Sequence, residues 1–226
     1  MQLTIFNGSP RQKKSNSTLL IHQFLNGYHD HTTHNTPVHY LAAVQKNSEH
    51  LQAAQTADTL LIIFPLYTDA MPGQVKFFFE SLAEIDLKGK NIGFIVQSGF
   101  PEAYHSIFVE RYLEKLAKRL QCNYIGTVIK GGVEGIQIMP PSMTSKLYNS
   151  FFELGKHFAL TEKFKPEIVA KLRHPYRMSA VRRGVLRLMI ATGLANFYWN
   201  KKLKEHNAFE KRFARPYDSP TLLSLP

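Results

Sequence analysis

The sequence predicts an α/β domain built on a doubly wound parallel sheet, followed by a basic helical extension. Apolar segments alternate with amphipathic segments up to about residue 160, as strands joined by crossover helices do. Two strand segments, 59–64 and 91–97, are almost continuously apolar, which is typical of strands covered on both faces. The 226 residues suit one large domain, or one domain of ordinary size with an extension.

The expected elements follow in order along the chain. Strands are expected at 2–6, 36–41, 59–64, 91–97 and 124–129. Helices are expected at 16–27, 48–55, 73–84, 105–121 and 142–160. One side of the amphipathic helix 105–121 is expected to carry Ile107, Phe108, Tyr112, Leu116 and Leu120. Crossovers between parallel strands are right-handed and ligands bind at the carboxyl ends of the strands, so the loops after the strands become the candidate site.

The loop after the first strand, residues 7–18, is rich in hydroxyl and basic side chains. It contains four Ser or Thr residues and three cations, and it leads directly into the first helix. A helix N-terminus offers unpaired N–H groups and the positive end of the helix dipole. The loop therefore predicts an anion site, most simply for a phosphate. The alternative for the loop alone is a polar surface loop with a Ser or Asn helix cap.

Three further loops, 65–73, 98–104 and 131–136, meet at the same expected edge of the sheet. Their aromatic and apolar side chains, Tyr67, Met71, Phe100 and Tyr104, are suited to line a slot for a flat ring. Glycines in these loops allow the backbone to approach a ligand closely. Each loop alone is explained by the need for turn residues. Together with the first loop, they favour a nucleotide-like ligand.

Three motifs in this order resemble the flavodoxin-like NAD(P)H-dependent FMN reductases, which are relatives of the quinone and azo-dye reductases. The motifs are Asn7–Arg11 with Ser15–Ser17, Pro65–Tyr67 with Met71–Gly73, and Ser98–Glu102. The resemblance covers about residues 1–160. It implies a sheet in the order 2-1-3-4-5, FMN as cofactor and NAD(P)H as co-substrate. Residues 1–164 are therefore expected to form a flavodoxin-like FMN-binding domain, and residues 165–226 a basic helical extension.

The resemblance also implies which residues hold the cofactor. Those implied for the FMN phosphate are Ser9, Arg11, Ser15, Asn16, Ser17 and Thr18. One border of the isoalloxazine ring would be formed by Pro65, Leu66, Tyr67, Thr68 and Met71. The other border would be formed by Ser98, Gly99, Phe100 and Glu102, while Gly131 and Gly132 match the family pattern less closely. The chain departs from the family in its basic insert, Gln12–Lys14, in its C-terminal extension, and in lacking the cysteine cluster of the iron–sulfur branch.

The implied activity is FMN-dependent transfer of electrons from NAD(P)H to a small acceptor such as a quinone or free flavin. No Walker lysine motif, H-E-x-x-H or G-x-S-x-G is present in the sequence, which agrees with a flavin supplying the redox chemistry. The fingerprint G-x-G-x-x-G is also missing after the first strand, which argues against a Rossmann-type NAD site. The alternatives are a non-enzymatic electron carrier and a scaffold that has lost the flavin. Carriers of this fold are usually acidic, and the pI of about 9.7 disfavours that alternative.

The catalytic side chains remain unassigned by sequence, with two weak candidates. Glu102 and His105 follow the fourth strand and are candidates for relaying protons, although helix capping or surface placement explains each equally well. Backbone N–H groups around 98–99 or 131–132 are expected to stabilise the negative charge of a reduced flavin.

Cysteine and histidine usage limits other chemistries. The single cysteine, Cys122, excludes an internal disulfide and an iron–sulfur site, favours a reducing, cytoplasmic setting and is expected to be a buried structural thiol. His29, His31 and His34 have a spacing that in principle binds a metal, but exposed loop positions are favoured and no metal is expected. No signal peptide or membrane-spanning apolar run is visible.

The positive charge is concentrated in the extension. Residues 1–164 contain 15 Lys and Arg against 13 Asp and Glu, a net charge of +2, whereas residues 165–226 contain 13 against 4, a net charge of +9. Three interpretations stay open: a helical extension packed on its own domain or in a homodimer, an amphipathic helix on an acidic membrane surface, and a basic cover that attracts the phosphates of NADPH. No nucleic-acid-reading motif is present, so no nucleic-acid partner is expected.

Overall fold

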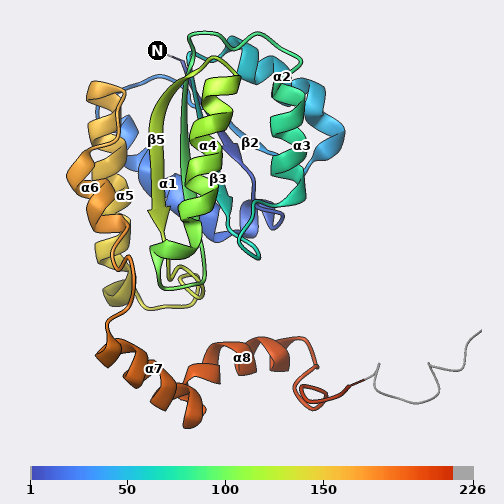
Figure 1. The fold of residues 1–226 in the computed structure, drawn as a ribbon, viewed down its shortest axis with the longest axis vertical. Coiled ribbons are helices and arrows are strands. Elements are labelled where there is room, and N and C mark those ends of the chain that lie inside the picture. The colour runs from blue at the N-terminus through green and yellow to red at the C-terminus, as the bar shows by residue number, and fades with distance from the viewer. Residues whose placement is uncertain (1, 216–226) are drawn as a thin grey trace, which may run out of the picture. The chain divides into compact units, whose positions relative to one another are not determined.

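A computed structural model describes residues 2–215, apart from the side chains of residues 195 and 198. Five strands form one parallel sheet: β1 (Leu3–Asn7), β2 (Val38–Tyr40), β3 (Thr59–Pro65), β4 (Asn91–Gln97) and β5 (Asn123–Lys130). Their order is β2-β1-β3-β4-β5 (Figure 1). This order confirms the doubly wound fold class and the 2-1-3-4-5 topology that the sequence predicted.

The helices agree closely with the predicted segments. Those of the α/β part are α1 (Asn16–His29), α2 (Asn47–Thr56), α3 (Gly73–Leu82), α4 (Ile107–Arg119), α5 (Pro141–Thr161) and α6 (Pro166–Leu172). The C-terminal part contains α7 (Ala180–Ala191) and α8 (Phe197–Glu205). Short 3-10 turns lie at η1 (Gln12–Lys14), η2 (Val44–Lys46), η3 (Ala103–Ser106) and η4 (Leu194–Asn196). Within the described residues, no helix combines the length and apolar character that crossing a bilayer requires.

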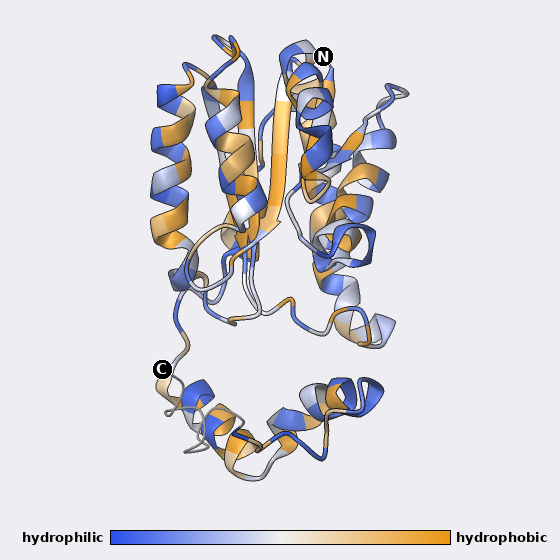
Figure 2. Cartoon of the chain, turned by 90° about the vertical axis from the view of Figure 1, so that its right-hand side faces the viewer, coloured by the Kyte–Doolittle hydropathy of each residue, from blue (hydrophilic) through white to orange (hydrophobic). Residues whose placement is uncertain are grey.

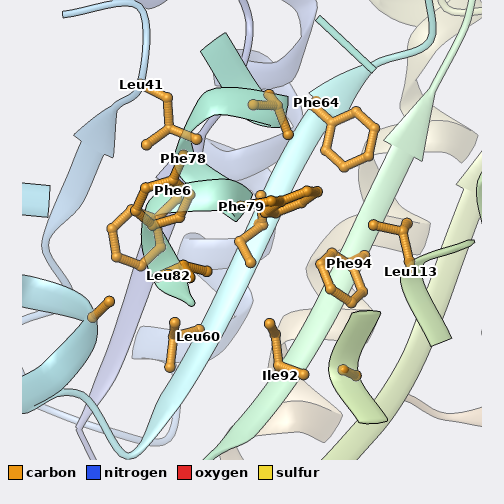
Figure 3. Close-up of a cluster of buried hydrophobic side chains, with 14 of the residues drawn as sticks. Phe6, Leu41, Leu60, Phe64, Phe78, Phe79, Leu82, Ile92, Phe94 and Leu113 are labelled. Atoms are coloured by element: carbon orange, nitrogen blue, oxygen red, sulfur yellow. The ribbon is translucent and has the colours of Figure 1, made fainter. Parts of the chain in front are cut away.

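One face of the sheet is covered by α2, α3 and α4 and is rich in phenylalanine (Figure 3). Phe6 of β1 lies against Phe78 of α3 with ring centroids 4.8 Å apart. Phe79 meets Phe94 of β4 edge to face at 6.0 Å. Because aromatic rings bury large apolar areas, this cluster anchors α3 and thereby the loop that follows β3.

The other face is covered by α1 and α5, which pack unusually closely. A Cβ atom added to Gly27 of α1 would lie 1.9 Å from the carbonyl oxygen of Phe152, and one added to Gly155 of α5 would lie 1.9 Å from that of Phe24. The two glycines are therefore reciprocal: each makes room for the backbone of the opposite helix. This crossing fixes the axis of α1, whose first turn borders the candidate site.

The helix α4 buries only part of the face that was expected: Leu116 and Leu120 pack against the phenylalanine-rich core. Its buried residues are Val109, Leu113 and Ala117, while Phe108 and Tyr112 are 62% and 46% exposed. The prediction was wrong for these two aromatic residues because it placed the largest apolar side chains on the buried side. The helix instead aligns a stripe of smaller side chains, four residues apart, with the sheet.

The compact α/β unit extends to Arg177, beyond the boundary expected at residue 164, and the second unit runs from Met178. The reason is that α6 joins the core: Phe164 and Leu172 are buried in the cluster beneath α1 and α5. Arg173 forms an ion pair with Glu110 of α4. In the second unit, Ser179 caps α7 by accepting the Arg182 N–H at 3.3 Å.

Candidate functional site

The loop between β1 and α1 is shaped by its own polar side chains. Asn7 is buried at the end of β1, where its Nδ2 donates to Thr18 Oγ1 at 2.9 Å and its Oδ1 accepts the Ser9 N–H at 2.9 Å. Ser15 caps α1 by accepting the Thr18 N–H at 3.1 Å. The chain therefore builds the loop around Asn7, a residue that the sequence motif contains but that was not assigned a role.

Two of the predicted phosphate hydroxyls are used inside the loop. Ser15 Oγ and Thr18 Oγ1 both donate to the Gln12 carbonyl, at 2.6 and 2.9 Å. The N–H groups of Asn16 and Ser17 lie in the first turn of α1, where a helix provides no acceptor. The groups available to an anion are therefore backbone N–H donors and nearby cations rather than these two hydroxyls.

The loop after β5 is bound to the loop after β1 by side-chain hydrogen bonds. Asn16 Nδ2 donates to the Val133 carbonyl at 2.9 Å. Gln137 accepts from the Arg11 guanidinium at 3.2 Å and donates to the Lys14 carbonyl at 2.8 Å. Sequence reasoning missed Gln137, because a polar residue in a glycine-containing loop carries no distinguishing signal.

Four of the predicted loops contribute to one small pocket at the carboxyl ends of the strands. It is lined by Ser9, Arg11, Asn16, Pro65, Leu66, Tyr67, Gln97, Ser98, Gly99 and Glu134. Eight of these were predicted from the sequence. Gln97 and Glu134 were not, although Gln97 is a polar residue at the end of an apolar strand, a detectable signal. Gln97 is buried and its Nε2 lies 3.4 Å from Ser17 Oγ.

One residue of the pocket lining has a buried side-chain oxygen with no partner. Asn16 is 5% exposed, and its Oδ1 is one of two buried side-chain polar atoms without a hydrogen-bond partner in the described part of the chain. Buried polar atoms are almost always paired, and the exceptions mark functional positions or sites for an additional group. The group that would satisfy Asn16 Oδ1 is a donor such as a hydroxyl.

Comparison with known families decides the classification. A profile described as the flavodoxin-like fold matches residues 1–146. The chain belongs to this family. A sequence search of curated proteins found no match.

Solved structures similar to this flavodoxin-like protein share its fold at low identity. An NADPH-quinone reductase from P. pentosaceus is 18% identical, with a TM-score of 0.55 over 68% of this chain and 96% of its own. An FMN-dependent NADH-azoreductase from Bacillus anthracis str. Ames Ancestor, in complex with FMN, is 17% identical, with a TM-score of 0.53 over 70% and 100%. General stress protein 14 from Treponema denticola, also in complex with FMN, is 18% identical, with a TM-score of 0.54 over 70% and 99%.

Two of the glycines that were predicted to border the flavin, Gly131 and Gly132, bring the loop after β5 against the loop after β4. A Cβ added to Gly131 would lie 2.5 Å from the Phe100 carbonyl oxygen. The Gly132 N–H donates to that same oxygen at 2.8 Å, and the Ser98 N–H donates to Lys130 at 3.0 Å. The N–H groups of Ser98 and Gly132, which were expected to face a reduced flavin, are therefore engaged within the protein.

The loop after β3 makes a tight turn beside the pocket. Tyr67 and Ala70 exchange two backbone hydrogen bonds of 2.9 and 3.0 Å across Thr68 and Asp69, both of which have positive φ. Tyr67 is 47% exposed, and burial of the rest of the side chain raises the pKa of its hydroxyl. Met71 instead packs against the phenylalanine-rich core and lies outside the pocket lining. Thr68 is exposed at the turn.

The two weak catalytic candidates form a cluster with an aromatic ring and a second carboxylate. Phe100 stacks on His105 with centroids 4.6 Å apart and an interplanar angle of 27°. His105 lies 3.6 Å from Glu102 through Nε2 and 3.9 Å from Asp69 through Nδ1. These atoms are close enough for ion pairing when His105 is protonated. None of the four residues lines the pocket described above.

The cysteine and the three clustered histidines of the flavodoxin-like protein lie outside the pocket lining. Cys122 is half-buried, its thiol contacts the Leu87 carbonyl at 3.4 Å, and burial raises its pKa to about 11. His29, His31 and His34 are exposed. Within the described residues, no group of three His, Cys, Asp or Glu side chains is arranged to hold a metal ion.

Proposed function

We propose that the protein is an FMN-dependent oxidoreductase that passes electrons from NAD(P)H to a small acceptor such as a quinone or free flavin. The observation that carries the proposal is the pocket at the strand ends, to which the loops after β1, β3, β4 and β5 all contribute. In doubly wound sheets this is the position where ligands bind. The FMN-bound azoreductase and stress protein with the same fold support the choice of flavin.

The donor set at one end of the pocket suits a phosphate. The N–H groups of Asn16 and Ser17 open α1, and the positive end of the helix dipole adds to their attraction. Arg11 lines the pocket, and Lys13 and Lys14 are exposed in the same loop. No acidic residue occurs between Met1 and His29, so these cations have no carboxylate in the loop to neutralise them.

The unpartnered oxygen suits the chain of hydroxyl groups between the phosphate and ring of FMN. Asn16 lines the pocket, and its buried Oδ1 has no donor. A ribityl hydroxyl is such a donor. Asn16 would then hold the cofactor with Oδ1 while its Nδ2 keeps the Val133 carbonyl in place.

The ring end of the site is assigned to Tyr67, Leu66, Ser98 and Gly99. A bound flavin supplies hydride and electron transfer, whereas the protein orients it and excludes water. The Tyr67 hydroxyl is protonated at neutral pH, as that of any tyrosine with an ordinary or raised pKa is, so it would act as a hydrogen-bond donor next to the ring. A Cβ atom added to Gly99 would lie 3.3 Å from the Glu134 side chain. Glycine therefore avoids a close contact between these two residues of the pocket lining.

Two measurements test the proposal. Visible absorption of the purified protein, followed by titration with FMN, is expected to give stoichiometric binding with a perturbed flavin spectrum. Stopped-flow mixing with NADPH or NADH is expected to reduce the bound FMN, seen as loss of its visible absorbance, as fast as the enzyme turns over. Failure to bind FMN would favour a scaffold without flavin. Binding without reduction by either nucleotide would favour an electron carrier.

A further inference from the structure

The C-terminal helices expose an unusual amount of apolar surface. In α7, Val181, Val185 and Leu188 are 77%, 54% and 65% exposed, and no residue of this helix is buried. In α8, Phe197 and Trp199 are 72% and 58% exposed. Exposed apolar patches of this kind are uncommon on isolated soluble domains and mark surfaces that meet a partner or a membrane.

The same segment is strongly basic, and its one acidic residue is Glu205 at the end of α8. Arg182, Arg183 and Arg187 lie in α7, and Lys201 and Lys202 lie in α8. No Asp or Glu occurs anywhere between residues 168 and 204. The charge of this surface therefore complements an anionic partner.

One face of α7 is apolar, and the opposite side carries two arginines together with one apolar residue, Ile190, which is 56% exposed. Val181, Val185 and Leu188 are spaced by four and three residues and share one face. Arg183 and Arg187 are two and six residues beyond Val181, which places them on the opposite side at 100° per residue. Figure 2 shows the resulting alternation of hydrophobic and hydrophilic colour along the C-terminal helices.

We infer that residues 180–205, α7 to α8, bind the surface of a membrane that contains anionic lipid. The apolar face would enter the boundary between headgroups and acyl chains, with the arginines and lysines at the headgroup phosphates. The helix lies on the membrane and does not cross it, because α7 has 12 residues, too few for a span. Trp199, with an apolar ring and one polar N–H, belongs to the residue type enriched at this depth.

Charge argues against a second copy of the chain as the occupant. Contact of two copies through the apolar face of α7 would cover Val185 and Leu188, but it would leave the arginines on the opposite side without an anionic partner, since residues 168–204 of each copy contain no acid. A nucleic acid would satisfy the charges, but it would leave Val185 and Leu188 in water. An anionic lipid surface is the partner that accommodates both features.

The chain that enters this segment is fixed to a loop of the candidate site. The Ala103 and Tyr104 N–H groups donate to Pro175 and Tyr176 at 3.0 and 3.1 Å, and the Arg177 guanidinium lies 3.9 Å above the Tyr104 ring. The membrane-binding segment therefore begins immediately after the residues that hold the loop following β4.

Vesicle binding tests the inference without reference to flavin. The full-length protein is mixed with vesicles of phosphatidylcholine alone or with added phosphatidylglycerol, and the bound fraction is measured by sedimentation. Binding is expected only to the anionic vesicles and is expected to weaken as salt is raised. Changing Arg182, Arg183 and Arg187 together to Gln should weaken binding about 100-fold, because each cation near an anionic surface contributes about fivefold.

A matched variant controls for net charge. Changing Lys88, Lys115 and Lys118 to Gln removes the same charge from exposed positions of the α/β unit and should leave vesicle binding within about twofold. A second variant, V185S with L188S, keeps all cations and should weaken binding at least tenfold, because it removes apolar contact. Melting temperatures confirm that each variant is folded.

Three results would overturn the inference. They are absence of binding to anionic vesicles, equal loss of binding in the control and arginine variants, and retention of full binding when Val185 and Leu188 are polar. Self-association or duplex DNA binding through α7, detected by ultracentrifugation or a mobility shift in the absence of vesicle binding, would identify the other occupants.

Discussion

Asn16 connects the first turn of α1 to the loop after β5 and leaves one buried oxygen unsatisfied. Its Nδ2 holds the Val133 carbonyl, while Oδ1 has no partner. An amide in this position joins two loops of the site and still offers an acceptor. The residue type was predictable from the Ser-Asn-Ser motif, but its two separate uses depend on Val133, which is far away in the sequence.

Replacing Asn16 with Ala is expected to weaken FMN binding about tenfold. The change removes an acceptor for the cofactor and frees the loop after β5, and one hydrogen bond of this kind contributes about 1 kcal/mol or somewhat more. Fluorescence titration with FMN measures the effect. The control is N47A, which removes a 3.0 Å hydrogen bond from Asn47 to Ser81. Neither residue lines the pocket, so FMN affinity should be unchanged. Equal affinities in wild type and N16A would remove Asn16 from the site.

His39 and His50 lie together against the phenylalanine-rich core. His39 stacks on Phe6 at 5.5 Å, and His50 meets Phe78 edge to face at 6.4 Å. Burial is the main cause that lowers the pKa of each below 6.5, and the neighbouring His39 lowers the pKa of His50 further. Lys46 acts in the same direction as burial, whereas Glu49 raises both pKa values. The unfolded chain therefore binds protons on these residues more readily than the folded chain does.

The stability of the protein is expected to fall as pH decreases below 6.5, the unfolded value for these histidines. Above that pH both states hold neutral imidazoles, so the pair contributes no pH dependence there. Urea unfolding followed by circular dichroism at neutral and mildly acidic pH measures the slope. His50→Leu should flatten the slope, whereas the exposed variant His22→Leu should not. A slope unchanged in His50→Leu would assign the acid sensitivity to other groups.

At the scale of elements, the crossing of α1 and α5 controls where the site's first helix begins. Gly27 and Gly155 each lie against the backbone of the other helix, with no space for a methyl group. The sequence predicted both helices but not this contact, because a glycine within a helix gives no indication of its partner. The orientation of α1 therefore depends on two residues in the interior of helices rather than on the loop motif.

Gly27→Ala is expected to destabilise the protein by about 3 kcal/mol, at the upper end of overpacking costs, because the backbone of α5 must shift. Chemical unfolding followed by circular dichroism measures the change. The matched control is Gly184→Ala in α7, where an added Cβ meets nothing within 4 Å. That control should be neutral or slightly stabilising, since alanine favours helix. Equal stability of both variants would contradict the close crossing.

Local pattern was sufficient for the strands and for the loops that meet at the pocket, whereas most of the individual pocket residues were implied by the family resemblance. Continuous apolar runs located β3 and β4, and the loops after them supplied Tyr67 and Ser98. The pattern was insufficient wherever the position of a side chain depends on a partner that is distant in the sequence. Phe108 and Tyr112 were wrongly expected on the buried side of α4, which Ala117 helps to form. Gln97 was missed because its side chain contacts Ser17, which is far away in the sequence.

At the scale of the whole molecule, both hydrophobic clusters consist of residues between Leu3 and Leu172. None of the described side chains of α7 and α8 belongs to either cluster. The α/β unit, which ends at Arg177, therefore contains a complete core. This explains how a chain can carry a strongly basic segment without placing its charge in the folded interior.

A chain ending at Arg177 is expected to fold and to melt within a few degrees of the full-length protein. It should retain FMN affinity and lose binding to anionic vesicles. Thermal unfolding by circular dichroism, FMN titration and vesicle sedimentation check the three expectations separately. A truncated chain that aggregates or melts far lower would assign a structural role to residues 178–226.

Residues 173–177 connect the C-terminal helices to the α/β unit, and their contacts determine how the chain would respond to force. The contacts are the Arg173–Glu110 ion pair, two backbone hydrogen bonds to Ala103 and Tyr104, and the Arg177 guanidinium above the Tyr104 ring. These contacts lie along the chain between the C-terminal helices and the sheet. Tension applied from the C-terminus would load them first and would peel the chain from the loop after β4 before any strand separates.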